Sequence, residues 1–297
     1  MSSLRQEIPR ACSESSPRRK PLISRLISLA PLANARILRP IKTPATVTLH
    51  DQPKLSVLIP AYNEEELIRG VIDSVHASFS AVGFKAYEVV VCDNNSTDRT
   101  AVIAEEAGAR LVFEPHNQIA KARNAAAAQA RGEWLIFLDG DTFLNPKLLQ
   151  VTIEALQAGR ICAGGAVVSF DRPDSGLITR ALTRFWNTIS ARLGVAAGSY
   201  VYCLRAAWAD VGGFDEQVYA GEELFFSRKL KRWAKKHGMR FHVFASHPVI
   251  TSARKLDWYG QGELLRRFLR MVIQPNAIKR REACGLWYER PSPKAEK

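Results

Sequence analysis

The segment Trp134–Asp141, WLIFLDGD, places two carboxylates directly after a short run of apolar residues. The run Trp134–Leu138 is typical of a buried strand in a parallel sheet. Ligands of such sheets bind beyond the carboxyl ends of the strands, where Asp139 and Asp141 are expected, and Gly140 between them lets backbone approach closely. Paired carboxylates on a loop suit Mg²⁺ or Mn²⁺ bridging a diphosphate. Asp and Gly are also ordinary turn residues, so it is the position after a strand that favours a ligand site.

Strands and helices alternate regularly around this motif, which predicts a parallel sheet of the nucleotide-binding type. Asn63 is expected to cap the first helix, and Asn145 with Pro146 marks the start of the fourth. The predicted strands are 55–60, 87–92, 109–114 and 134–138, and the helices between them are 64–80, 98–107 and 118–130.

After residue 160 the alternation becomes less regular, and this half is expected to extend the same sheet and form the acceptor side. Its predicted strands are 162–170, 199–204 and 240–250, and its predicted helices are 175–193 and 222–236. Beyond residue 257, apolar residues recur at helical spacing among arginines, in a basic tail that bears Trp258, Tyr259, Trp287 and Tyr288.

Composition bounds the class of protein. The 297 residues, 46% apolar and 24% charged, are those of an ordinary globular chain with a sizeable core. Five cysteines without Cys-x-x-Cys spacing argue against a zinc site or disulfide framework and fit a reducing compartment. The sequence contains no run of 18 apolar residues, so no transmembrane helix is predicted.

The net charge of +13 is unevenly distributed along the chain. Residues 1–54 carry +7, residues 55–227 carry −7 and residues 228–297 carry +13. An acidic middle between basic ends is unlike a nucleic-acid-binding protein, and it suits a metal–carboxylate centre with flanks attracted to an anionic surface. We therefore expect a basic, largely disordered leader over 1–52, which the sequence leaves open as a targeting segment, and a basic aromatic tail over 257–297 that contacts a membrane surface.

Four segments in order carry a family resemblance: PAYNEEE, VVVCDNNSTDRT, NQIAKARNAAAAQARGEWLIFLDGDT and VGGFDEQVYAGEELFFSRKL. In this order and spacing they resemble inverting family 2 glycosyltransferases over about residues 55–250. The resemblance implies an α/β fold of the GT-A type, a Rossmann-like three-layer sandwich with a mostly parallel central sheet. The catalytic domain would span 53–256, with a nucleotide-sugar half at 53–143 and an acceptor half at 144–256.

The resemblance places donor-binding residues at the first two strand ends. Pro60, Tyr62 and Glu64 belong to the loop that lines the nucleotide pocket in the family, and Glu64 is suited to hydrogen-bond a ribose. Termination of the strand by Pro60 and capping by Asn63 explain this loop equally well. Asp93 ends the second strand, where its carboxylate can accept N–H bonds from a base or ribose. The family usually has a second acid next, whereas this chain has Asn94, so the base is left open.

The same resemblance implies that Arg123 and Asp139 contact the donor and that Asp141 holds the divalent ion. A guanidinium suits phosphate recognition, which favours Arg123, although a solvated helix face explains basic residues on this helix as well. His247 is expected to complete the metal shell and Arg254 to contact the diphosphate. A single His on a strand is more often structural.

Glu222 and Glu223 occupy the place where the family shows Glu-Asp and where the second acid deprotonates the acceptor. Either carboxylate can act as a general base, so Glu223 is the expected base and Glu222 its rival. Acids are also common in the first turn of a helix, here the helix running to Lys236.

The expected reaction transfers a sugar from a nucleotide-sugar donor to an acceptor hydroxyl with inversion, helped by Mg²⁺ or Mn²⁺. The expected partners are that donor, a glycan or lipid-linked acceptor and an anionic membrane contacted peripherally, without nucleic acid. The expected location is the cytoplasm, at the inner face of the membrane. Two other classes stay open: a nucleotidyltransferase on a similar sheet, and a non-catalytic module that binds sugar nucleotides.

Overall fold

The computed structural model describes residues 52–172, 176–254, 262, 266 and 275–288. All of them belong to one compact unit, Thr46–Lys297. The leader predicted over 1–52 lies outside the described residues except for Gln52, as does most of the helix predicted beyond residue 257.

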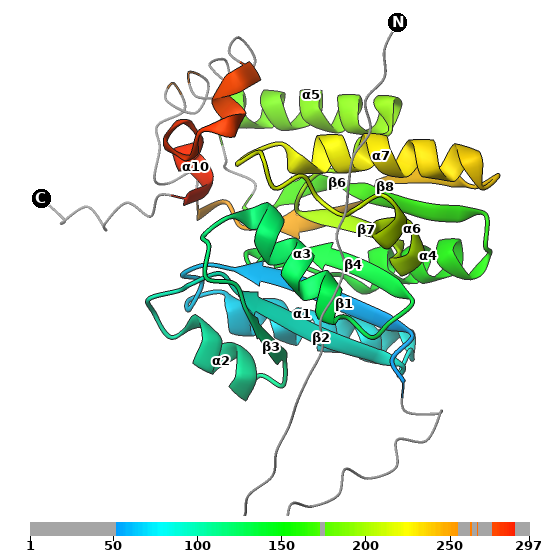
Figure 1. Cartoon of the computed structure of the whole chain (residues 1–297), viewed down its shortest axis with the longest axis horizontal. Helices are drawn as coiled ribbons and strands as arrows, with labels where there is room; N and C mark the ends of the chain where they lie inside the picture. The colour runs from blue at the N-terminus through cyan, green and yellow to red at the C-terminus, as the bar shows by residue number, and fades with distance from the viewer. Residues whose placement is uncertain (1–51, 173–175, 255–261, 263–265, 267–274, 289–297) are drawn as a thin grey trace, which may run out of the picture. The chain divides into compact units, whose positions relative to one another are not determined.

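An eight-stranded sheet forms the centre of this unit, in the order β3-β2-β1-β4-β7-β6-β8-β5 (Figure 1). The strands are β1 Leu55–Ala61, β2 Tyr87–Asp93, β3 Arg110–Phe113, β4 Trp134–Leu138, β5 Thr142–Phe143, β6 Ile161–Phe170, β7 Tyr200–Leu204 and β8 Arg240–Thr251. The α-helices are α1 Ile68–Val82, α2 Thr100–Glu106, α3 Ile119–Gln129, α4 Pro146–Gln157, α5 Leu177–Leu193, α6 Arg205–Asp210, α7 Glu222–Lys236 and α10 Gly285–Tyr288, and the 3₁₀ turns are η1 Pro275–Lys279 and η2 Arg281–Cys284.

The first half of the sheet is parallel and the second half is mixed. β1 pairs in parallel with both β2 and β4, so their carboxyl ends meet at one edge. β7 runs antiparallel to β4 and β6, whereas β6 and β8 are parallel to each other. The second half therefore extends the same sheet, as the sequence predicts.

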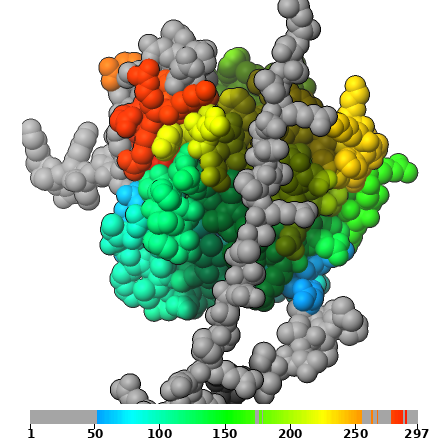
Figure 2. Space-filling view, viewed as in Figure 1, coloured from blue at the N-terminus to red at the C-terminus, as the bar shows by residue number. Residues whose placement is uncertain are grey.

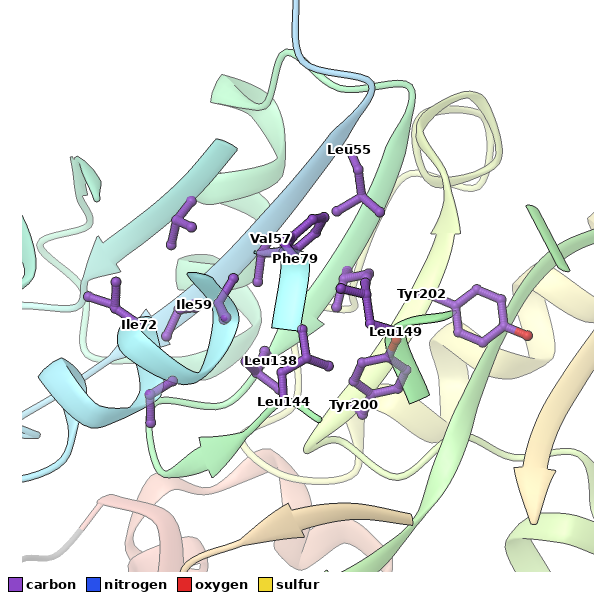
Figure 3. Close-up of a cluster of buried hydrophobic side chains, with 14 of the residues drawn as sticks. Leu55, Val57, Ile59, Ile72, Phe79, Leu138, Leu144, Leu149, Tyr200 and Tyr202 are labelled. Atoms are coloured by element: carbon purple, nitrogen blue, oxygen red, sulfur yellow. The ribbon is translucent and has the colours of Figure 1, made fainter. Parts of the chain in front are cut away.

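The core lies on both faces of the sheet because strand side chains alternate between them. On one face, α1 and α4 cover Leu55, Val57 and Ile59 of β1, together with Leu138 of β4 (Figure 3). On the other face, α3, α6 and α7 cover a second cluster that includes Leu58 of β1. This arrangement confirms the predicted three-layer α/β sandwich.

Local signals place some elements correctly and others not. Asn145 caps α4, where its side chain accepts the Leu148 N–H at 3.0 Å, as predicted. The predicted cap at Asn63 is wrong, because α1 begins only at Ile68. Asn63 instead adopts a left-handed conformation (φ 51°), and its side-chain oxygen accepts the Thr97 N–H at 2.8 Å. The Asn side chain thus joins two loops at the sheet edge.

Among the residues that the structure describes, no helix is both long enough and apolar enough to cross a lipid bilayer.

Candidate active site

Three strand ends and the start of one helix converge on the candidate site. β1 and β2 end in register, with Ala61 opposite Asp93, and Asp139 follows directly after β4. Glu222 begins α7, after Gly221, whose positive φ of 72° turns the chain into the helix. The fold therefore brings the ends of these strands together with the start of α7, although they are far apart in the sequence.

Arg123 of α3 is the cation that joins two of these carboxylates, Asp139 and Glu222. Its side chain is 2% exposed and donates to Asp139 Oδ1 at 2.7 Å and to the Gly198 carbonyl at 2.9 Å. Its other terminal nitrogen donates to Glu222. Burial by itself would lower the pKa of Arg123, but Asp139 and Glu222 raise it above its ordinary value. A buried guanidinium is thus held charged between two acids, which contradicts the solvated-face interpretation of Arg123.

The next residue on α3, Asn124, fixes the loop that leads to α7. Its amide nitrogen donates to the Phe214 carbonyl at 3.0 Å, and its amide oxygen accepts the Phe214 N–H at 2.9 Å. The same helix therefore positions both the acidic end of β4 and the approach to Glu222.

Glu222 and Glu223 have different surroundings although they are adjacent. Glu222 is buried and ion-paired with Arg123. Glu223 forms no ion pair within the described part of the chain, and its carboxyl carbon would lie 3.6 Å from a Cβ added at Gly198. Burial and then the neighbouring charge of Glu222 raise the pKa of Glu223 to about 8. One acid is ion-paired with Arg123, and the other has a high proton affinity.

Asp141 lies on the other side of Gly140 from Asp139 and is 4% exposed. The hydroxyls of Thr142 and Thr251 lie 3.4 and 3.5 Å from its Oδ1, at the long end of the hydrogen-bond range. Its backbone carbonyl accepts the Ser252 N–H at 2.9 Å. The end of β8 thus packs directly beside Asp141.

Arg254 follows β8 and connects the two halves of the fold. It donates to Glu64 and, at 3.0 Å, to Glu66, both in the loop after β1. Burial by itself would lower the pKa of Arg254, but Glu64, and to a lesser extent Asp141, raise it. The predicted donor-side residues Glu64 and Arg254 are therefore brought together, next to Asp141.

The remaining donor residues lie at the β1 and β2 ends. Asp93 is 9% exposed, and its Oδ1 accepts the Ser96 N–H at 3.0 Å. Asn94, which stands where the family usually has an acid, donates to the carbonyls of Glu114 and His116. This shows that Asn94 ties the β2 and β3 loops together. Pro60 lies within β1, so the strand does not end there, contrary to the prediction. Tyr62 is half-buried and directly follows the last residue of β1.

His247 is not brought to Asp141 by any contact among the described residues. It lies where β8 loops out, since Phe244 and Val249 of β8 pair with Ala166 and Val168 of β6. Its ring contact is with Phe244, at 6.5 Å between centroids. Nor do the described residues contain a group of three or more His, Cys, Asp or Glu that would hold a metal ion alone.

The C-terminal segment 275–288 packs against the approach to Glu222, a contact that the sequence did not reveal. The Tyr288 hydroxyl accepts the Ile119 N–H at 3.3 Å and donates to the Tyr219 carbonyl at 3.0 Å. The Tyr219 N–H in turn donates to the Ile278 carbonyl at 2.6 Å. Figure 2 shows this segment in red against the green surface that includes α3.

This packing corrects one prediction. Tyr288 does not serve as an exposed membrane anchor, because it is 7% exposed and packs with Cys284 and Ala220. Trp258 and Tyr259 lie outside the described residues, as does the side chain of Trp287.

Replacing Tyr288 with Phe is expected to lower both stability and kcat. It removes two hydrogen bonds of about 0.5–1.5 kcal/mol each, and it loosens the segment before Glu222. We expect kcat to fall about three- to tenfold in a steady-state assay. The matched control is Tyr87→Phe, which loses a hydrogen bond to His76 Nδ1 away from the site and should lower the melting temperature with kcat unchanged. Equal kcat in wild type and Tyr288→Phe would contradict this role.

Comparisons with known proteins place this chain in a family. Residues 56–203 match the family described as Glycosyl transferase family 2. The chain is 26% identical over 254 residues to the glycosyltransferase AglE of Haloferax volcanii, with 79% of this chain and 80% of that protein covered. It is 31% identical to the undecaprenyl-phosphate 4-deoxy-4-formamido-L-arabinose transferase of Edwardsiella ictaluri, with 51% of this chain and 48% of that protein covered.

A solved structure shows the same fold. The mannosyltransferase PcManGT of Pyrobaculum calidifontis, in complex with GDP-Man and Mn²⁺, superimposes with a TM-score of 0.58 at 21% identity, over 82% of this chain and 66% of that one. The family match favours a glycosyltransferase over the nucleotidyltransferase and the non-catalytic module. The segments that carried the resemblance lie in the fold that the family requires, and the chain belongs to glycosyltransferase family 2.

Proposed function

We propose that this glycosyltransferase moves a sugar from a nucleotide-sugar donor to an acceptor hydroxyl with inversion, and that Glu223 is the general base. The supporting observation is the contrast between two adjacent acids. Arg123 is ion-paired with Glu222, whereas Glu223 forms no ion pair among the described residues. Burial and the Glu222 charge outweigh the lowering effect of Arg123 and raise the pKa of Glu223 to about 8. A base with a pKa near the working pH removes a proton most effectively.

The donor half of the site is assigned to the strand ends. Asp93 would accept from the nucleoside, with Pro60, Tyr62 and Glu64 lining the pocket. Asp139 is the more accessible acid of the Asp-Gly-Asp pair, since its side chain is 28% exposed while it contacts Arg123. This leaves its second oxygen for the ribose or sugar of the donor. Arg254, beside Glu64 and Asp141, is the cation suited to the diphosphate.

The residues at Asp141 fit a divalent cation. A buried carboxylate with two hydroxyls beyond 3.3 Å is a hard-oxygen environment, which Mg²⁺ and Mn²⁺ prefer. Mg²⁺ is usually bound by one or two carboxylates together with substrate phosphates and water, so a set of three protein ligands is not required. Such an ion would neutralise the negative charge on the departing diphosphate. His247, whose ring contacts Phe244, stays a proposed further ligand of that ion.

The chemical step follows from this placement. Glu223 takes the proton of the acceptor hydroxyl as that oxygen forms a bond to the anomeric carbon. The bond from the anomeric carbon to the diphosphate oxygen breaks with its electron pair on the leaving nucleoside diphosphate. Attack opposite the leaving group inverts the configuration, so no covalent enzyme intermediate is needed.

The acceptor is proposed to be a glycan or a lipid-linked group. This proposal rests on relatives alone: one is named as a transferase acting with undecaprenyl phosphate, and the chain spans about half of that protein. We further propose that the protein works in the cytoplasm, at the inner face of the membrane.

The pH dependence of kcat/KM tests the assignment of the base. Because the acting form of Glu223 is deprotonated and its pKa is raised to about 8, log(kcat/KM) should rise with pH and level off above about pH 8. The Glu222 charge contributes to that rise, so Glu222→Gln should shift the rising limb to lower pH. A wild-type profile that is flat between pH 5 and 9 would exclude Glu223 as a base of raised pKa.

A further inference from the structure

Helix α5 presents an exposed face that combines arginines with large apolar side chains. Leu177, Phe185 and Leu193 are 76%, 57% and 60% exposed, which makes them three of the most exposed large apolar residues in the described chain. Arg180 and Arg184 are also exposed. None of the 17 residues of α5 is acidic. Such an exposed apolar set is unusual for a helix that faces only water.

The charge of this face continues onto α7. The Lys231 ammonium group donates to the Leu193 carbonyl at 2.7 Å, so the end of α5 adjoins the middle of α7, and Figure 1 shows the two helices side by side. Exposed basic residues follow on α7, whose only acids are Glu222 and Glu223 in the site: Arg228, Lys231, Arg232, Lys235 and Lys236.

We propose that the exposed face of α5, flanked by the basic side of α7, docks onto an anionic lipid bilayer. A surface helix whose exposed face carries Leu, Phe and basic residues can lie in the interface, with its apolar side chains among the acyl chains and its basic groups at the lipid headgroups. Each basic residue near an anionic leaflet adds to binding. The phosphates of a nucleic acid could pair with the arginines, but a nucleic acid would not bury the apolar side chains of Leu177 and Leu193.

The position of α5 connects this face to the active site. Asn187 of α5 donates to the Val168 carbonyl at 2.8 Å and accepts the Val168 N–H at 3.0 Å, two residues before β6 ends. The last residue of β6, Phe170, pairs with Thr251, whose hydroxyl adjoins Asp141. A bilayer beneath α5 would therefore lie near the Asp141 side of the site. That it presents a lipid-linked acceptor there rests on the proposed function, whereas the docking itself does not.

Vesicle co-sedimentation of the full chain tests the docking. We expect the wild type to bind phosphatidylcholine vesicles containing phosphatidylglycerol at low salt, and to bind pure phosphatidylcholine vesicles weakly. Arg180→Glu/Arg184→Glu should weaken partitioning at least about tenfold, since each basic residue near an anionic leaflet is worth about a fivefold factor. Phe185→Ser should weaken it several-fold at any salt concentration, because it removes apolar area.

The matched control is Lys147→Glu/Arg160→Glu, which makes the same charge change at exposed positions on and after α4. It should bind vesicles within about twofold of the wild type. Binding by Arg180→Glu/Arg184→Glu equal to the wild type would overturn the proposal, as would wild-type binding to duplex or single-stranded DNA but not to vesicles. Sugar transfer in vesicle-free buffer should be unchanged in both double variants. If the wild type transfers sugar but does not bind anionic vesicles, only the docking is refuted. If the wild type binds the vesicles but transfers no sugar, only the proposed function is refuted.

Discussion

Replacing Glu223 with Gln is expected to lower kcat by about 10²–10⁴-fold, the usual contribution of a general base. Gln preserves the size of the side chain but has no site that binds the acceptor proton. The donor should still bind, because the charged groups that act on Glu223 are Glu222, Arg123 and Asp139, and Gln leaves all three in place. Donor affinity measured by calorimetry should therefore stay within about twofold of the wild type.

Glu222→Gln is the matched comparison because it makes the same change one residue earlier. Here we expect a smaller loss of kcat and a clear loss of stability, since Glu222 is buried against Arg123. Breaking one partner of a buried ion pair costs about 3–5 kcal/mol, and the amide oxygen of Gln retains part of the contact. If Glu222→Gln had no turnover and Glu223→Gln had normal turnover, the general base would be Glu222 and not Glu223.

Replacing Asp141 with Asn is expected to reduce kcat/KM at least about a hundredfold. A divalent ion contributes several kcal/mol to stabilising the charge of the leaving group, and each 1.36 kcal/mol is about tenfold in rate. Asn keeps the shape and still accepts from the Thr142 and Thr251 hydroxyls, so the fold should persist. The loss should appear in kcat/KM and in the Mn²⁺ concentration needed for half-maximal rate.

The control for Asp141→Asn is Asp171→Asn, which lies at the end of β6 and accepts the Ala253 N–H at 2.9 Å. It makes the same chemical change close to the site, but on an exposed residue, and should leave kcat/KM and metal dependence unchanged. If Asp141→Asn kept the metal dependence of the wild type, the ion would have to be held elsewhere.

The sequence predicted correctly those elements whose position is determined by neighbouring residues. The run Trp134–Leu138 is buried throughout and forms β4 as expected, and the predicted helix 222–236 has the bounds of α7. Asn145 with Pro146 marked the start of α4 because a cap and its helix are adjacent in the chain. Such signals need only neighbouring residues, so they can be read without knowledge of the fold.

The contacts that complete the site join distant residues, and no local pattern indicates them. Arg254 pairs with Glu64 across 190 positions, and Tyr288 contacts Ile119 across 169. Asn63 had the composition of a helix cap, but its side chain contacts Thr97 in another loop instead. His247 had the right residue type for a metal ligand, yet the looped-out part of β8 places it against Phe244. In each case tertiary packing, which the local sequence does not show, decides the contact.

We propose that Asp141 binds the donor diphosphate through a divalent ion, and nucleotide binding tests this most directly. Thermal unfolding would be followed with UDP, GDP, CDP and dTDP, each with Mn²⁺ and with EDTA, for the wild type and Asp141→Asn. We predict that at least one nucleoside diphosphate raises the melting temperature of the wild type by several degrees with Mn²⁺, as a ligand at about 100 times its Kd adds about 2.7 kcal/mol. This increase should vanish with EDTA and in Asp141→Asn. Stabilisation that is the same with EDTA, or that persists with Mn²⁺ in Asp141→Asn, would contradict the account.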